Sequence, residues 1–238
     1  PPEDTDDPQR TPTTPRGHRP LGDEDSEIED GDVVVPKSHV RKRNADPCVI
    51  KGCKWPRSED MKVYVPYVIA NNYCEYYTSA QQKTIEQAFS FFANSTCIRF
   101  VPRNEEQDYL YIHSFNGYDC RSYVGRKGNR QELFLEKDGC IVASVIQHEL
   151  LHALGFQHEQ KRSDRDEYIK MLWENIIKGT TANTTKTLTL NLETPYDYNS
   201  VMHYRGKYCH SLPSTDFMFP AMGMSYWDIE RVNRLYCR

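Results

Sequence analysis

The chain has 238 residues, a formal net charge of −4 and 38% hydrophobic residues, so it can form a core of ordinary size. It has neither the basic character expected of a nucleic-acid-binding protein nor an apolar run near the roughly 20 residues of a membrane span. We therefore expect a globular monomer with no nucleic-acid partner and no membrane span.

The net negative charge comes entirely from the N-terminal stretch, because residues 1–43 hold 11 acidic and 7 basic side chains whereas residues 44–238 hold 23 of each. Residues 1–27 are rich in Pro, Thr, Asp and Arg and have too few apolar side chains to order themselves, which predicts disorder. The segment 28–36 is the only part of this region with an apolar run that could dock on another surface.

A basic triplet, Arg41-Lys42-Arg43, lies where the composition changes from disordered to globular. Three basic residues alone are more often a solvated charge run. At this boundary, however, they predict cleavage after Arg43 by an activating protease. The expected organisation is a removable segment at 1–43 and a globular domain at 44–238.

The chain has eight cysteines, none of them in the C-x-x-C pairs typical of structural zinc sites. Eight free thiols in a cytosolic protein are the alternative, but disulfides formed in an oxidising compartment explain the count more simply. The N-x-S/T triplets at Asn94 and Asn183 agree with secretion, although such triplets are common by chance. We expect a secreted, extracellular protein.

Short strands and helices are predicted along the globular part. Proline has no backbone N–H to donate to a neighbouring strand. Pro66 therefore predicts that the strand at 63–69 lies at an edge of its sheet. Thr78 or Ser79 can cap a helix that runs to about Asn94. The other predicted elements are strands at 97–101, 109–113 and 131–135, and helices at 143–154, 166–176 and 226–235.

A set of histidines follows the start of the helix predicted at 143–154. His148 and His152 are four residues apart, so a helix places both imidazoles on one face. Gly155 can adopt the left-handed conformation that ends a helix, and this turn can bring His158 back as a third ligand. Three imidazoles without a thiolate favour Zn²⁺, one per chain, with an open position typical of a catalytic site.

Glu149 follows the first ligand, where it is badly placed to bind the same ion and well placed to take a proton from water. Zinc lowers the pKa of bound water to about 7, so a carboxylate can complete its deprotonation for attack on a peptide carbonyl. Glu149 can then pass the proton to the leaving amine. The predicted activity is zinc-dependent cleavage of an extended protein or peptide substrate.

The long histidine motif with a downstream Met-turn is the signature of the metzincins. The segment Ser200-Val201-Met202-His203-Tyr204 supplies that turn, with Met202 as an apolar floor beneath the site. Together with Glu159 after the third histidine, these residues resemble the astacin metallopeptidases. Further similar stretches are 97–102, 162–166, 194–198 and 233–237, and the resemblance covers residues 44–237. The pair Cys48 and Cys53 is similar to that of fish hatching-enzyme-like astacins.

The resemblance implies roles for residues outside the histidine motif. Tyr204 is expected to be a fifth, switchable zinc ligand that stabilises the oxyanion, rather than a core tyrosine. Cleavage after Arg43 is expected to free the amino group of Asn44, which becomes buried and linked through water to Glu159. The alternative for Glu159 is a solvated surface charge.

The resemblance also implies that residues 1–43 are a propeptide. Zymogens of the family carry a Phe-x-Gly-Asp motif whose Asp occupies the open position on zinc. Here the corresponding residues are Glu29-Asp30-Gly31-Asp32, so Asp32 matches and the Phe is missing. The alternative for Asp32 is a plain turn residue.

The disulfide pattern implied by the resemblance pairs Cys97 with Cys237, Cys120 with Cys140, and Cys48 with Cys53. Cys74 and Cys209 lie outside this pattern, and we predict that they form a fourth bridge. The chain departs from the family pattern at 205–225, where Arg205 follows the Met-turn tyrosine and the stretch from Cys209 to Met224 is shorter than the resemblance leads us to expect. This segment is expected to help wall the primed side of the cleft, so the resemblance implies catalysis more firmly than substrate preference.

The expected fold is α+β and metzincin-like, with a twisted mixed sheet and two helices in the N-terminal half. The C-terminal half should be mostly irregular, with the active-site cleft between the halves and the substrate paired antiparallel with an edge strand. Two rival functions remain: an inactive binding protein that keeps the fold, supported by the divergent 205–225 segment, and a module with purely structural zinc. The complete ligand set and Glu149 favour the peptidase.

Overall fold

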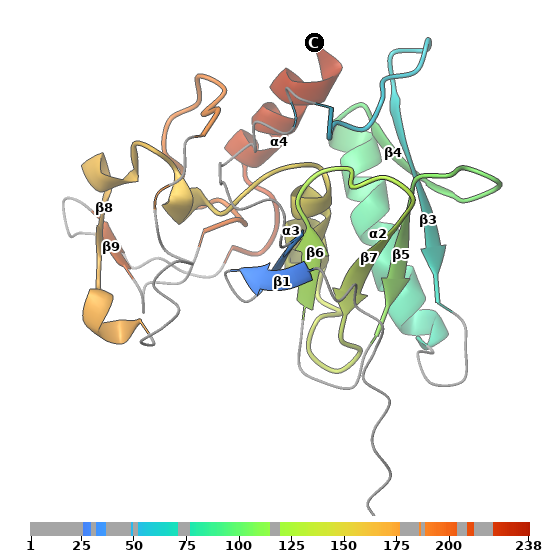
Figure 1. Cartoon of the computed structure of the whole chain (residues 1–238), viewed down its shortest axis with the longest axis horizontal. Coiled ribbons are helices and arrows are strands. Elements are labelled where there is room, and N and C mark those ends of the chain that lie inside the picture. Colours follow the sequence, from blue (N-terminus) through green and yellow to red (C-terminus); the bar gives the residue numbers. More distant parts are fainter. Residues whose placement is uncertain are drawn as a thin grey trace, which may run out of the picture.

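The computed structural model describes residues 26–29, 32–36, 49, 52–70, 77–114, 120–176, 186, 189–203, 209–211 and 221–238. One region holds a large mixed sheet with two long helices, and the other holds short helical turns and a small two-stranded sheet (Figure 1). This arrangement confirms the predicted α+β fold. Within these residues, no helix is long and apolar enough to cross a membrane.

The large sheet has seven strands in the order β1-β2-β6-β7-β5-β3-β4. Its central strands β3, β5 and β7 are parallel, as are β3 and β4, whereas β6 runs antiparallel to β7. The bounds of these five strands are β3 (Val63–Ile69), β4 (Ile98–Pro102), β5 (Tyr109–His113), β6 (Cys120–Tyr123) and β7 (Arg130–Leu135).

Two further strands of this sheet come from the segment predicted to be a propeptide. β1 (Ser26–Glu29) and β2 (Val33–Pro36) form an antiparallel hairpin. β2 pairs in parallel with β6, so the hairpin extends the sheet at that edge.

The core lies between one face of the sheet and the helices α2 (Ser79–Ser95) and α3 (Ala143–Ala153). α2 starts at the predicted cap, because Thr78 and Gln81 form a capping box. Its apolar stripe and the inward-facing residues of the sheet are fully or almost fully buried; they include Ile85, Phe89, Phe92, Leu110, Ile112, Leu133 and Leu135.

The prediction that β3 is an edge strand is wrong, because β4 lies outside it. Pro66 is tolerated for a local reason. β5 pairs with β3 only from Tyr67 to Ile69, so the missing N–H of Pro66 falls in the part of β3 that β5 does not pair.

The helix predicted at 166–176 is also wrong. This stretch forms a 3-10 turn (Arg165–Glu167), the strand β8 (Ile169–Met171) and another 3-10 turn (Trp173–Asn175). Ile169 and Met171 are buried in a second apolar cluster, whereas Lys170 between them is exposed. This alternation suits a strand, and β8 pairs antiparallel with β9 (Cys209–Ser211).

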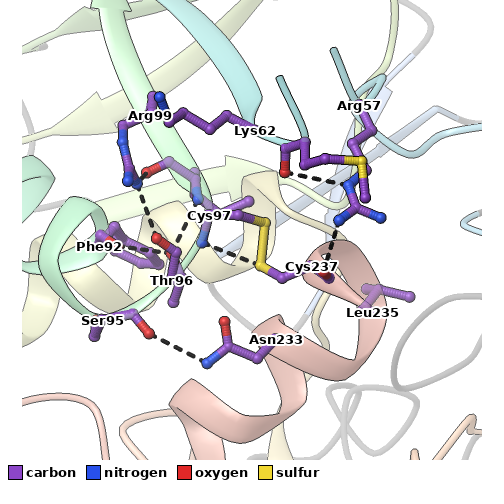
Figure 2. The surroundings of a disulfide bond; sticks show 12 residues. Arg57, Lys62, Phe92, Ser95, Thr96, Cys97, Arg99, Asn233, Leu235 and Cys237 are labelled. Carbon is purple, nitrogen blue, oxygen red and sulfur yellow. Dashed lines mark hydrogen bonds between the residues drawn. A yellow bond between two sulfur atoms is a disulfide. The ribbon is translucent and has the colours of Figure 1, made fainter. Parts of the chain in front are cut away.

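The last helix, α4 (Tyr226–Val232), continues as a π-helical turn at Asn233–Cys237. A disulfide joins its end to the start of β4 through Cys97 and Cys237, and Asn233 donates a hydrogen bond to the Ser95 carbonyl nearby (Figure 2). The chain end therefore packs on the last turn of α2.

The other cysteines divide into three cases. A second disulfide joins Cys120 to Cys140. Cys53 is disulfide-bonded, whereas Cys48, its predicted partner, lies outside the described residues. Cys209 is a free thiol, buried in the second apolar cluster, which contradicts the predicted bridge to Cys74.

Candidate metal centre and active site

The C-terminal end of α3 is fixed by hydrogen bonds to its last carbonyl groups. The His152 carbonyl accepts from the backbone N–H groups of Gly155 and Gly125, both at 2.8 Å. The Ala153 carbonyl accepts from the Trp55 indole at 2.9 Å. The last carbonyl groups of a helix lack partners within the helix, so these contacts stabilise the C-terminal end of α3.

Gly155 makes the turn that the sequence predicted, with φ of +101°. A Cβ at this position would lie 2.6 Å from Cγ1 of Val49. Both the backbone conformation and the close approach of Val49 therefore require glycine.

We expect Gly155→Ala to lower the free energy of unfolding by about 2–4 kcal/mol, from backbone strain and overpacking together. Gly128→Ala is the matched control, because Gly128 has φ of +90° but the nearest atom to an added Cβ is 3.9 Å away. It should lose only about 1 kcal/mol. Urea unfolding measures both variants, and equal losses would contradict the packing argument.

The three predicted histidine ligands meet at one point. Their Nε2 atoms are 3.1 Å apart for His148 and His152, 3.3 Å for His152 and His158, and 3.2 Å for His148 and His158. Nitrogens bound at 2.0–2.1 Å to one tetrahedral zinc ion would be about 3.3 Å apart. The three side chains therefore fit this ion.

Two backbone carbonyls orient two of these three rings. Nδ1 of His148 lies 2.8 Å from the Val201 carbonyl, and Nδ1 of His152 lies 2.7 Å from the Phe156 carbonyl. A carbonyl only accepts, so each Nδ1 carries the proton and leaves the Nε2 lone pair for the metal. Burial, together with the charges of His148 and His158, lowers the pKa of His152 and favours the neutral form that binds metal.

Asp32 lies at the same point. Its Oδ2 atom is 3.0 Å from Nε2 of His158 and 3.3 Å from Nε2 of His148. Burial acts to raise the pKa of Asp32, but the charge of His158 and the hydrogen bonds of His148 and His158 outweigh it and hold the pKa well below its usual range. The carboxylate is therefore ionised, and the four side chains could hold one metal ion.

The chain around Asp32 covers the edge of the sheet next to the metal site. The Asp32 carbonyl accepts a 2.8 Å hydrogen bond from the N–H of Ser122, and Val33 and Val34 pair with Ser122 and Tyr123. Val33 is 1% exposed and Val34 is 6% exposed. β2 thus occupies an edge at which a substrate could pair, and it runs parallel to β6 rather than antiparallel.

The other predicted site residues are placed less completely. Glu149 is buried on α3 directly after His148, and Met202 is buried next to the site. Tyr204, Arg43 and Asn44 lie outside the described residues, so their roles remain predictions.

Glu159 is buried at 2% exposure, which excludes the solvated surface charge. Its carboxylate accepts two hydrogen bonds of 2.8 Å from Arg231, one of 3.2 Å from Arg162 and one of 2.8 Å from the backbone N–H of Asp197. Burial raises the pKa of Glu159, and the two arginines oppose that effect. A cavity of about 20 Å³, roughly the space of one water molecule, adjoins Glu159 and Arg231.

The family is decided by a family model that matches most of the chain. The model of the Astacin peptidase family matches residues 53–237. This chain belongs to the astacin family. It is 46% identical over 222 residues to low choriolytic enzyme of Oryzias latipes, covering 88% of this chain and 78% of that protein. It is 44% identical over 221 residues to high choriolytic enzyme 1 of the same fish, with the same coverage.

A solved structure supports the same assignment. High choriolytic enzyme 1, described as a hatching enzyme zinc-protease from Oryzias latipes, superposes with a TM-score of 0.71 at 44% identity over 79% of this chain and 96% of that one. The chain is thus an astacin-family zinc metalloendopeptidase similar to the hatching enzymes. This confirms the predicted family, fold and enzyme class.

One residue of the astacin site was missed in the sequence. Asp228 on α4 is 2% exposed and accepts hydrogen bonds from the Ser200 hydroxyl at 2.6 Å and the Val201 N–H at 2.9 Å. The Val201 carbonyl in turn orients His148. The only sequence signal was the spacing of Ser225 and Asp228, which predicts a capping box but not this second contact.

We expect Asp228→Asn to lower the free energy of unfolding by about 2–4 kcal/mol and to weaken zinc binding. The carboxylate now accepts from the Ser200 hydroxyl through Oδ1 and from the N–H groups of Val201 and Ser225 through Oδ2. An amide has one oxygen for these two positions, so at least one buried donor loses its acceptor, at about 1–3 kcal/mol. The nearby Arg231 also loses a negatively charged neighbour. Glu230→Gln, a more exposed change on the same helix, should change stability far less, because its ion pairs are screened by solvent. Urea unfolding and zinc titration test both; normal zinc affinity in Asp228→Asn would refute the link to His148.

Proposed function

We propose that this chain is the zymogen of a secreted zinc endopeptidase that cleaves extracellular proteins, and that cleavage after Arg43 activates it. The observation that carries the proposal is the Asp32 carboxylate beside all three imidazoles. With β2 on the edge of β6, the segment 28–36 would block both the metal and the substrate strand. On this proposal residues 1–43 are the propeptide and residues 44–238 are the peptidase domain.

The proposed mechanism assigns each step to residues of this chain. His148, His152 and His158 would hold zinc, which supplies Lewis acidity and lowers the pKa of water to about 7. Glu149 takes the proton of the attacking water and delivers it to the leaving amine. Tyr204 donates its hydroxyl hydrogen to the oxyanion that develops on the scissile carbonyl.

Maturation is proposed to act at Glu159. Removal of residues 1–43 would free the amino group of Asn44, which would approach this carboxylate through water. The water-sized cavity beside Glu159 and Arg231 supports such a bridge, because it has room for the water molecule. Secretion is supported by the disulfides Cys97–Cys237 and Cys120–Cys140, which persist in oxidising compartments.

The endopeptidase proposal is tested by mapping products. The zinc-loaded chain, trimmed after Arg43, is incubated with an unfolded protein, and the new peptide ends are identified by mass spectrometry. Internal cleavage throughout the substrate is expected. Removal of residues only from the substrate's ends would instead indicate an exopeptidase, and no cleavage by a folded, zinc-loaded chain would favour the inactive binding protein.

A further inference from the structure

Asn94 lies in the last turn of α2, on the side that faces away from the core. The inner side of α2 carries Ile85, Phe89 and Phe92, all buried. Asn94 follows Phe92 by two residues, which is about 200° around the helix, and its side chain is exposed. Asn94, Ser95 and Thr96 form an acceptor triplet for N-glycosylation with no proline at the middle position.

The surroundings of the triplet connect it to an oxidising compartment. Thr96 is followed directly by Cys97, which forms the disulfide with Cys237. The Ser95 carbonyl accepts a hydrogen bond from Asn233, a few residues before Cys237 (Figure 2). The compartment in which this disulfide forms is also the one in which N-glycans are added.

The hydroxyl of Thr96 indicates when the modification would occur. It donates to the Phe92 carbonyl at 2.7 Å and accepts from the Ile98 N–H at 3.1 Å. The folded protein thus uses this hydroxyl to end α2 and begin β4. A glycosylation enzyme that reads the hydroxyl must therefore act before α2 and β4 have formed.

An aromatic ring lies beside the acceptor. Phe91 is three residues before Asn94, so the two side chains share one face of α2, and Phe91 is 37% exposed. A single exposed phenylalanine is common and carries nothing alone. Next to a sugar attached at Asn94, however, its ring offers an apolar surface that the sugar can cover.

We propose that Asn94 carries an N-linked glycan whose first sugar covers the exposed ring of Phe91. A bond forms between Nδ2 of Asn94 and C1 of the sugar, while the bond from C1 to oxygen breaks in a lipid-diphosphate-linked oligosaccharide donor. The lipid diphosphate leaves, and the amide loses one proton. The proposal rests on the proposed secretion of this chain.

The test expresses the full chain behind a cleavable secretory leader in a eukaryotic cell, so that it does not depend on a native leader. Peptide mapping then reads Asn94 separately from the second triplet at Asn183. A sugar at Asn94 that peptide N-glycosidase removes, leaving aspartate, supports the proposal. An unmodified Asn94 in protein that contains the Cys97–Cys237 disulfide overturns it. A peptidase assay of the same preparation reports on the proposed function independently.

Three variants separate the acceptor from the fold. Asn94→Gln removes the acceptor alone and should abolish the modification without reducing peptidase activity. Thr96→Ser keeps both the triplet and the hydroxyl contacts and should remain modified. Folded chain produced without glycosylation and then exposed to the transfer enzyme should stay unmodified; modification at that stage would contradict the order of events inferred from Thr96.

The contact between the glycan and Phe91 is tested by the melting temperature of the chain with and without the glycan. Enzymatic removal of the glycan should lower the melting temperature of the wild-type chain by roughly 2–4 °C. Asn94→Asp made without a glycan is the matched control and should melt at the same temperature as the deglycosylated chain. In Phe91→Ser, glycan removal should cause no shift. An equal shift in both chains would refute the contact.

Discussion

Glu149→Gln is expected to lower the kcat/KM of the trimmed enzyme by about 10²–10⁴-fold while one zinc ion per chain remains bound. The amide cannot accept the proton of the attacking water, but it is close in shape to the carboxylate and leaves the three histidines unchanged. The two readouts are peptide cleavage and the zinc content of the purified protein.

The matched control is Glu105→Gln, the same chemical change at an exposed residue of the loop between β4 and β5. It should leave both zinc content and cleavage unchanged. Full activity in Glu149→Gln would remove the general base from the mechanism. Loss of zinc in that variant would mean that Glu149 supports the metal site instead.

Asp32→Ala is expected to raise the activity of the uncleaved chain by roughly 10²-fold or more. Contacts of an ionised carboxylate are worth about 1.5–3 kcal/mol each, and 1.4 kcal/mol corresponds to a factor of ten. The strand β2 would remain paired with β6, so the gain should stop short of the trimmed enzyme. The measurement compares peptide cleavage before and after trimming at Arg43.

Glu27→Gln provides the control within the same hairpin, because Glu27 belongs to β1, where its backbone pairs with Val35, and the metal cluster of the described residues consists of Asp32 and the three histidines. The uncleaved Glu27→Gln chain should stay inactive. After trimming, all of these chains are identical in sequence and should have equal activity. An uncleaved Asp32→Ala chain as inactive as wild type would show that latency does not depend on the carboxylate.

The metal site could be predicted from the sequence because its geometry is local. The four-residue spacing of His148 and His152 requires only a helix, and Gly155 has the positive φ that brings His158 back. The disulfide pairs and Asp32 needed more than spacing, since they join residues far apart in the chain. The family resemblance supplied those pairings.

The parts that were missed depend on contacts that leave no local pattern. β2 and β6 lie far apart in the chain, so no pattern within either segment predicts that they pair. β8 was predicted as part of a helix because its three residues are too few to establish an alternation. Asp228 was missed because its contact with Val201 also joins distant segments, α4 and the Met-turn.

The most direct test is cleavage of a quenched fluorescent peptide library by one zinc-loaded preparation, before and after trimming at Arg43, with and without a zinc chelator. The account predicts activity that appears on trimming, that the chelator abolishes and that added zinc restores. Equal activity before and after trimming would contradict latency through Asp32. Activity that survives complete removal of zinc would contradict the zinc peptidase itself.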